Sequence, residues 1–465
     1  MDIEETDIIV IGMGPGGEDA AGKLAQAGLH VTGVEAKLVG GECPYWGCVP
    51  SKMMIRAAGL LAEARRIPGI AGAASATPDW GPVAARIRAE ATDSWNDKVA
   101  VDRFTGKGGH FVRGRGRITG RGEVTAETAE GALLLRARRG VVIATGTEPT
   151  IPPVPGLAGA PYWTSREAIE TKEVPESLIV LGGGAIGAEL AQVFARFGAT
   201  VSVVEALPRL LPIEEPEAGE LLAGVFAREG ITVRSGARAE QVGYDGSQFT
   251  VSLAGGEVLT ARRLLVATGR RATITSLGVA AYGLDETARA IATDEKMRAA
   301  DGLWAIGDIT GEGAFTHVAM YQAGIAVADI LGQDGPPADY RAVPRVTFTD
   351  PEIGSVGLTE AQARRQGLAV RTGVTQLPSS ARGWIHKAGN DGFIKLIEDS
   401  GRGVLVGATS AGPAGGEVLG ALAVAVHGQV PVAALQTMIY AYPTFHRAIE
   451  DAVRNLADAQ IPGQS

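Results

Sequence analysis

Residues 8–17 read Ile-Ile-Val-Ile-Gly-Met-Gly-Pro-Gly-Gly, an apolar run that ends in a cluster of glycines. The run is typical of a strand buried on both faces, and the pattern after it predicts a helix that extends to about Ala27. A second apolar stretch, residues 31–34, ends in Glu35. A strand, a glycine-rich turn, a helix and a second strand in this order predict a βαβ unit with parallel strands.

The glycine spacing indicates what such a unit binds. In the pattern GxGxxG, Gly12 makes the tight turn, Gly14 lets a pyrophosphate approach the backbone, and Gly17 lets the helix pack closely on the strand. The pyrophosphate then lies at the helix N-terminus, where free N–H groups favour negative charge. Glu35 is placed to accept hydrogen bonds from ribose hydroxyls.

The whole pattern occurs a second time. Residues 178–187 read Leu-Ile-Val-Leu-Gly-Gly-Gly-Ala-Ile-Gly, and a strand at residues 201–204 ends in Glu205. The acid follows the third motif glycine by 18 residues in both copies, from 17 to 35 and from 187 to 205. The second copy therefore predicts a second dinucleotide site, formed by Gly182, Gly184, Gly187 and Glu205.

A matching strand closes each copy. After residue 344 the pattern of apolar residues no longer follows that of the two copies. The closing strands are predicted at residues 141–146, which include Thr145 and Gly146, and at residues 264–269, which end in Gly269. Proline-rich residues 149–155 are typical of a hinge. The later strands and helices predict an α+β domain. The expected fold is α/β, with two Rossmann-like domains and a C-terminal α+β domain. The first Rossmann-like domain is expected over residues 1–150 and 271–340, the second over residues 151–270, and the α+β domain over residues 341–465.

Charge and hydropathy exclude several classes of partner. The net charge of the 465-residue chain is −9 and its pI is about 5.4, which argues against nucleic acid and anionic membranes as partners. The N-terminus is acidic, and no apolar run approaches the roughly 20 residues that a membrane span requires. We expect a cytoplasmic protein.

The chain contains two cysteines, Cys43 and Cys48, in the segment Gly-Glu-Cys-Pro-Tyr-Trp-Gly-Cys-Val-Pro-Ser-Lys that ends at Lys52. In a reducing compartment a close pair is typical of a catalytic or metal-binding site. A helix that starts near Cys48 lowers the pKa of a thiol there, and a thiolate is what disulfide exchange needs. Two inert thiols or a structural staple are the alternatives. Zinc is disfavoured because no further cysteine or histidine pair completes four ligands, so no metal site is predicted.

Together these motifs resemble the class I pyridine nucleotide–disulfide oxidoreductases, which include glutathione reductase, dihydrolipoamide dehydrogenase and mercuric reductase. The resemblance extends over essentially the whole chain, including Gly-Leu-Trp-Ala-Ile-Gly-Asp at residues 302–308. It implies a glutathione-reductase-like fold, a homodimer, bound FAD, and NADH as the coenzyme with NADPH possible. It also implies an electron transfer from NAD(P)H through FAD to a Cys43–Cys48 disulfide and on to a small-molecule acceptor.

The resemblance also implies roles for single residues. Cys43 exchanges with the substrate, and Cys48 faces the flavin as its charge-transfer thiolate. Lys52 pairs with Glu189 beside flavin N5. The expected FAD-binding residues are Gly12, Gly14, Gly17, Glu35, Lys52, Gly116, Thr145, Gly146, Asp308, Thr316 and His317, and those for the nicotinamide coenzyme are Gly182, Gly184, Gly187, Glu205 and Gly269.

One departure from the family pattern concerns the C-terminal acid–base pair. The family's motif has a histidine and a glutamate where this chain has Tyr442 and Arg447. His446 and Glu450 are four residues apart, and on a helix they meet on one face, so a displaced proton shuttle is one hypothesis and a surface contact is the other. A tyrosine hydroxyl, with an ordinary pKa of about 10, is a donor but a poor shuttle at neutral pH.

This departure leaves the acceptor open. Tyrosine near this site is similar to mercuric reductases, but residues 460–465 lack the cysteine pair that these enzymes usually carry. The leading hypothesis is a small disulfide or another thiol-reactive oxidant. A metal ion, a quinone and dihydrolipoamide chemistry are the alternatives. A redox-sensing protein with negligible turnover is a hypothesis of another class, against which the residues Cys43, Cys48, Lys52 and Glu189 argue.

Overall fold

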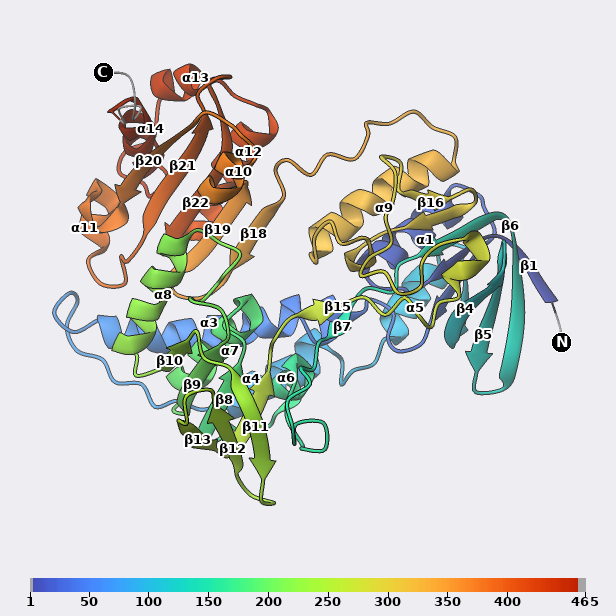
Figure 1. Ribbon diagram of the computed structural model, residues 1–465, viewed down its shortest axis with the longest axis horizontal. Helices are drawn as coiled ribbons and strands as arrows, with labels where there is room; N and C mark the ends of the chain where they lie inside the picture. Colours follow the sequence, from blue (N-terminus) through green and yellow to red (C-terminus); the bar gives the residue numbers. More distant parts are fainter. Residues whose placement is uncertain (1–2, 459–465) are drawn as a thin grey trace. The chain divides into compact units, whose positions relative to one another are not determined.

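The computed structural model describes residues 3–458. The segment 460–465, which lacks the cysteine pair typical of mercuric reductases, lies outside this range. The chain divides into two compact units (Figure 1). The first unit comprises Met1–Ser51, Ala84–Thr150 and Gly269–Tyr340, and the second comprises Lys52–Val83, Ile151–Thr268 and Arg341–Ser465. Residues 52–83 thus belong to the second unit, whereas the boundaries expected from the sequence keep them with the first.

The first unit is built on a sheet with the strand order β16-β17-β6-β1-β2-β3, to which β4 and β5 are added through β6. The strands β17, β6, β1, β2 and β3 run parallel, while β4, β5 and β6 form an antiparallel meander. Their bounds are β1 Ile3–Ile11, β2 Val31–Glu35, β3 His110–Arg113, β4 Arg115–Gly120, β5 Glu123–Thr128, β6 Gly131–Ile143, β16 Arg298–Ala300 and β17 Leu303–Ala305.

Helices cover one face of this sheet, and residues 8–11 of β1 are buried on both faces. Ile8 and Val10 pack with Leu24, Phe104 and Ala323 in one hydrophobic cluster, and Ile9 and Ile11 belong to a second cluster with β4, β5 and β6. The helices of the first cluster are α1 Pro15–Gln26, α5 Lys98–Thr105 and α9 Thr316–Ile330. The other short elements of the unit are α2 Glu42–Tyr45, η1 Ile87–Ala91, β7 Glu148–Pro149, β15 Arg270–Arg271, η2 Val279–Tyr282 and η3 Asp308–Thr310.

Two helices cross the boundary between the units as the chain runs. These are α3, Cys48–Arg66, and α4, Gly81–Arg86.

The second unit contains the second βαβ motif. Its parallel sheet has the order β10-β9-β8-β14, and a three-stranded antiparallel sheet has the order β11-β12-β13. The bounds are α6 Ser165–Glu170, β8 Ser177–Leu181, α7 Ala185–Arg196, β9 Thr200–Glu205, α8 Pro216–Arg228, β10 Thr232–Ser235, β11 Ala239–Tyr244, β12 Phe249–Leu253, β13 Val258–Ala261 and β14 Arg263–Val266.

The C-terminal part is an antiparallel five-stranded sheet with the order β18-β19-β22-β21-β20. Helices α12 and α14 pack with this sheet in one hydrophobic cluster, which gives the expected α+β domain (Figure 1). The bounds are β18 Pro344–Thr347, β19 Glu352–Gly357, α10 Glu360–Arg365, β20 Val370–Gln376, η4 Leu377–Ser379, α11 Ala381–His386, β21 Phe393–Asp399, β22 Val404–Gly412, α12 Gly415–His427, α13 Val432–Thr437 and α14 Ala448–Asp458. The fold class expected from the sequence is confirmed.

Within residues 3–458, no helix combines the length and the apolar character needed to cross a membrane.

Candidate functional site: a redox-active cysteine pair with two dinucleotide-binding motifs

The three motif glycines of the first unit each meet a different steric demand. Gly12 has φ +91°, and a side chain on it would lie 2.5 Å from the carbonyl oxygen of Ala144. A side chain on Gly17 would lie 2.0 Å from the carbonyl oxygen of Gly12, so α1 can approach β1 only at a glycine. Gly14 has open space where its side chain would be, at the N-terminus of α1. This space and the free N–H groups of α1 fit a pyrophosphate.

Glu35 lies at the end of β2, next to this turn. Its carboxylate accepts hydrogen bonds from the backbone N–H of Met13 at 2.8 Å and of Lys37 at 2.7 Å. Gly116 on β4 is buried against Ile11 and Val34, the residues that precede Gly12 and Glu35. A side chain at residue 116 would lie 3.0 Å from Ile11 Cγ2 and 3.3 Å from Val34 Cγ1, so glycine lets β4 pack closely on the ends of β1 and β2.

Residues 144–147 do not continue the strand predicted at residues 141–146. β6 ends at Ile143, and Gly146 has φ +65°, a conformation that a strand does not contain. In the second copy β14 ends at Val266, and Gly269 has φ +109°. Thr145, Gly146 and Gly269 therefore lie in the loops at the carboxyl ends of the strands, and this part of the sequence prediction is corrected.

Asp308 follows β17 at the same edge of the first sheet. Its carboxylate accepts a hydrogen bond of 2.8 Å from the Thr147 hydroxyl. Burial raises the pKa of Asp308, while the hydrogen bond from Thr147 and the nearby Arg270 act to lower it. Arg270 donates to the Thr147 hydroxyl at 3.0 Å and to its carbonyl oxygen at 2.6 Å, and lies 3.9 Å from Glu42.

Thr147 and Arg270 are not predicted from the sequence. Each lies next to a glycine that had been singled out, and this adjacency was the only signal.

The cysteine segment forms α2, a turn, and the start of α3 at Cys48. Both cysteines are free thiols, Cys43 half-buried and Cys48 exposed. The Thr316 hydroxyl, at the first residue of α9, lies 3.7 Å from Cys48 Sγ. The pKa of Cys43 is raised far above the usual value of a thiol, first by its hydrogen bond with Cys48 and then by burial, while the Thr316 hydroxyl acts in the opposite direction. The two thiols therefore lose their protons as an interacting pair.

The second residue of α9, His317, is exposed and its ring stacks on that of Phe315, with centroids 5.1 Å apart. Phe315 is the N-cap residue, and no side chain caps the helix. The N-terminus of α9 thus lies next to the Cys48 thiol.

The second motif repeats the geometry of the first. Gly182 has φ +107°, and a side chain on it would lie 2.3 Å from the carbonyl oxygen of Ala267. A side chain on Gly187 would lie 1.9 Å from the carbonyl oxygen of Gly182, and Gly184 again faces open space. Buried Glu205 accepts hydrogen bonds from the backbone N–H of Gly183 at 2.6 Å and of Leu207 at 2.7 Å.

Lys52 and Glu189 form an ion pair inside the second unit, with Lys52 Nζ 2.8 Å from Glu189 Oε2. The other carboxylate oxygen accepts a hydrogen bond of 2.8 Å from the backbone N–H of Phe348, and Lys52 Nζ lies 4.7 Å from the centre of the Phe348 ring. The Glu189 side chain is only 7% exposed, so both of its oxygens are held in place. Sequence reasoning missed Phe348 because a backbone N–H carries no residue signature.

The C-terminal residues do not form the helical pair that their spacing suggests. α14 begins at Ala448, so His446 precedes the helix. Glu450 is bound by Arg447 and Arg454, and the His446 ring lies beside Tyr440, with centroids 6.4 Å apart. Tyr442 is 69% exposed and carries the Arg447 guanidinium over its ring at 5.4 Å. In the part of the chain that the structure describes, no group of three or more His, Cys, Asp and Glu side chains is placed to hold a metal.

Known proteins are similar in sequence to this chain over most of its length. Residues 6–323 match the model of the pyridine nucleotide-disulphide oxidoreductase family, and residues 343–453 match its dimerisation domain. Dihydrolipoyl dehydrogenase of Chlorobaculum tepidum is 34% identical over 461 residues, which cover 96% of both chains. Mercuric reductase of Shigella flexneri is 34% identical over 459 residues, which cover 96% of this chain and 80% of the relative.

Solved structures are similar over the whole chain. LpdA of Mycobacterium tuberculosis has a TM-score of 0.86 and 28% identity, and the match covers 97% of this chain and 99% of that one. A Cu(II) complex of the HOCl-induced flavoprotein disulfide reductase RclA of Escherichia coli has a TM-score of 0.85 and 25% identity, with 98% and 99% covered.

Proposed function

We propose that this chain, a member of the class I pyridine nucleotide–disulfide oxidoreductase family, passes electrons through Cys43 and Cys48 to a small disulfide or another thiol-reactive acceptor. The members of this family are enzymes that use FAD and NAD(P)H. The observation that carries this proposal is the contact of the two thiols with each other and of Thr316 with both. A structural staple needs neither a hydroxyl at the sulfurs nor an exposed Cys48.

The residues at the first sheet edge fit FAD, which supplies two-electron exchange between a hydride donor and a disulfide. We propose that Gly12, Gly14 and Gly17 cradle its pyrophosphate and that Glu35 binds its ribose. Further residues proposed to bind it, as the family resemblance suggests, are Lys52, Gly116, Thr145, Gly146, Asp308, Thr316 and His317. The open space at Gly14 supports this assignment.

The thiol chemistry is a pair of exchange steps. Reduction of the disulfide gives a Cys43 thiol and a Cys48 thiolate, with uptake of two electrons and one proton. After a base removes its proton, Cys43 attacks one sulfur of the substrate disulfide, forms a mixed disulfide and releases one thiol. Cys48 then attacks Cys43 Sγ, releases the second thiol and restores the intramolecular disulfide. The first leaving thiolate takes the proton that the base removed from Cys43, and the second takes a proton from solvent.

The raised pKa of Cys43 gives this cycle a requirement for a base. In the family resemblance a histidine–glutamate pair supplies it, and this chain has Tyr442 and Arg447 at those positions. His446 and Glu450 remain a proposed substitute, although Glu450 is already paired with two arginines. The absence of the histidine–glutamate pair at these positions favours a second candidate for the acceptor, a metal ion that binds thiolates directly. The names of the mercuric reductase and of the Cu(II) complex of RclA suggest such an acceptor.

The nicotinamide coenzyme is proposed to bind through Gly182, Gly184, Gly187, Glu205 and Gly269, with NADH preferred. The Glu205 carboxylate repels a 2′-phosphate. Arg209 is the basic residue nearest in sequence, but its guanidinium donates to the carbonyl oxygens of Pro212 and Glu214. It is therefore engaged within its own loop.

The chain carries the family's dimerisation domain. We propose a homodimer in which Tyr442, at 69% exposure in the single chain, contributes to the partner's cysteine site. Mixing two inactive variants, Cys43→Ser and Tyr442→Ala, tests this arrangement. If each site draws residues from both chains, hybrid dimers regain one intact site, and activity returns after subunit exchange.

An acceptor screen tests the proposed function. The flavin-loaded protein is supplied with NADH and, in separate reactions, glutathione disulfide, lipoamide, a quinone, Cu(II) and Hg(II), with the Cys43→Ser and Cys48→Ser variants as matched controls. We expect an acceptor whose reduction is lost in both variants. Reduction that both variants retain at the wild-type rate for every acceptor contradicts a thiol-dependent function and indicates direct reduction by the flavin.

A further inference from the structure

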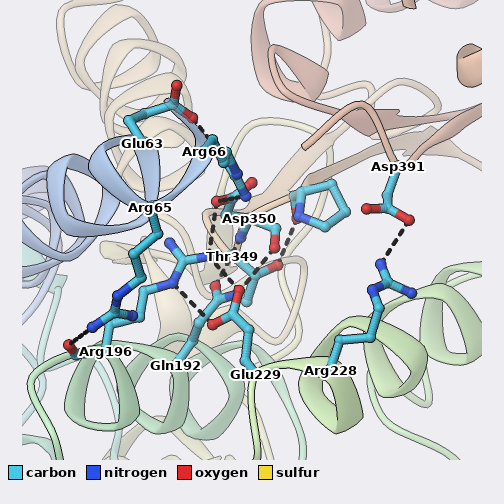
Figure 2. Close-up of polar contacts among 11 residues, drawn as sticks. Glu63, Arg65, Arg66, Gln192, Arg196, Arg228, Glu229, Thr349, Asp350 and Asp391 are labelled. Carbon is cyan, nitrogen blue, oxygen red and sulfur yellow. Dashed lines mark hydrogen bonds and ion pairs between the residues drawn. The ribbon is translucent and has the colours of Figure 1, made fainter. Parts of the chain in front are cut away.

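Asp350 lies at the centre of a polar network that ties together the two helices of the Lys52–Glu189 pair (Figure 2). α3 contains Lys52 near its start and ends at Arg66. α7 contains Glu189 and ends at Arg196. The Asp350 carboxylate accepts from Arg66 at 2.6 Å and from Arg196 at 2.8 Å, so one side chain holds the ends of both helices.

The backbone of residue 350 is held as firmly as its side chain. Gln192, on α7 one turn after Glu189, accepts from the Asp350 N–H at 2.8 Å and donates to its carbonyl oxygen at 2.9 Å. Two residues earlier, the Phe348 N–H donates to Glu189. One face of α7 is therefore hydrogen-bonded to both ends of the segment 348–350. The position of that segment sets where the Phe348 N–H meets the Glu189 carboxylate.

The network is built for position, since its charges are already compensated elsewhere. Arg196 is 4% exposed and makes a two-pronged contact with Glu229, at 2.6 and 2.9 Å, independently of Asp350. Arg66 also pairs with Glu63. Removal of the Asp350 charge therefore leaves no buried arginine without a carboxylate, and the fold does not depend on it for charge balance.

We propose that Asp350 is a positioning residue for the Lys52–Glu189 pair, acting through Gln192, the segment 348–350 and the ends of α3 and α7. The inference rests on the proposed function in one respect, namely that the pair lies beside N5 of the flavin, as the family resemblance implies, where the hydride arrives. Without Asp350, α3 and α7 lose the tie opposite the ion pair, and Lys52 samples positions away from Glu189.

The experiment compares Asp350→Asn with Asp391→Asn in the flavin-loaded protein. The Arg228–Asp391 pair, at 2.7 Å, is exposed and belongs to the same unit, but it contacts neither α7 nor the segment 348–350 (Figure 2). The first readout is trace acetylation of lysine amines, quantified for each lysine by mass spectrometry. The second is the rate of flavin reduction by NADH in stopped flow, at a saturating coenzyme concentration.

We expect Asp350→Asn to increase Lys52 acetylation by about threefold or more relative to the other lysines, and to slow flavin reduction, while Asp391→Asn changes neither. Arg66→Met, which cuts only the tie of α3, should act in the same direction and serves if Asp350→Asn folds poorly. The proposal is overturned if Asp350→Asn and Arg66→Met both lower the Tm but leave Lys52 acetylation equal to that of Asp391→Asn. Asp350 then has a purely structural role.

A third variant separates this inference from the proposed function. Glu189→Gln removes the pair itself and sets the largest acetylation change to be expected. If Glu189→Gln leaves flavin reduction at the wild-type rate, the proposed role of the pair in hydride transfer is wrong. The acetylation of Lys52 in Asp350→Asn still decides whether Asp350 positions it.

Discussion

Replacement of Thr316 by valine tests the electrostatics of the cysteine pair. The Thr316 hydroxyl lies 3.7 Å from Cys48 Sγ and also acts on Cys43. When Cys48 is ionised it can only accept, so the hydroxyl donates to it and stabilises the thiolate. Thr316→Val removes the hydroxyl and keeps the shape of the side chain.

The contact sets the size of the effect. A hydrogen bond to a charged group contributes about 1.5–3 kcal/mol, and the long contact to a diffuse sulfur favours the lower end. Since one pKa unit corresponds to about 1.36 kcal/mol, the lower apparent pKa of the dithiol should rise by about one unit in Thr316→Val. The sign is upward because the lost interaction favours the charged form.

The assay follows the rate of alkylation by iodoacetamide against pH, with the protein reduced beforehand by dithionite and kept anaerobic. Thr316→Ser is the matched control, because it keeps the hydroxyl and should titrate with the wild type. The apparent values belong to the pair rather than to one cysteine. If Thr316→Val and Thr316→Ser titrate alike within about 0.3 unit, the hydroxyl does not stabilise the thiolate.

Three further outcomes follow from the same structure. NADH should exceed NADPH in kcat/KM by about tenfold or more, about 1.4 kcal/mol, and Glu205→Ala should reduce that ratio; an equal ratio in variant and wild type would show that Glu205 does not discriminate. Lys395→Met should lower the free energy of unfolding by about 3 kcal/mol in urea titrations, because buried Lys395 pairs with Glu215 at 2.8 Å and removal leaves an uncompensated carboxylate. Burial acts to lower the pKa of Lys395, but the carboxylates around it raise that pKa overall, so this contribution should persist from neutral pH up to about 10 and fade only in stronger alkali; a loss between neutral pH and pH 10 contradicts the assignment. Tyr442→Phe should slow the thiol–disulfide half-reaction more than His446→Ala, with flavin reduction unchanged in both, and a larger defect in His446→Ala would support the displaced shuttle.

The C-terminal site shows where sequence spacing was insufficient. His446 and Glu450 have the separation of a helical pair, but α14 begins only at Ala448. Glu450 then lies within reach of Arg447 and Arg454, which compete for its carboxylate with full positive charges. Spacing alone does not state which of several partners at three and four residues a carboxylate will choose.

The dinucleotide motifs and the cysteine pair were determined by the sequence itself, because their chemistry is local. A glycine turn between a strand and a helix meets its steric demands within about 25 residues, as Gly12, Gly17 and Glu35 show. The cysteines lie five positions apart, so their contact needs no distant element. Sequence also predicts the layers, since apolar periodicity reports which faces are buried.

Only the tertiary structure brought together groups that are distant along the chain. Thr316 meets Cys48 across 268 residues, Thr147 meets Asp308 across 161, and Phe348 meets Glu189 across 159. Two of these contacts use a hydroxyl and one uses a backbone N–H, groups too common to mark a position in sequence. Their significance arises from tertiary packing within each unit, which places an ordinary donor within hydrogen-bonding distance of an ionisable sulfur or carboxylate.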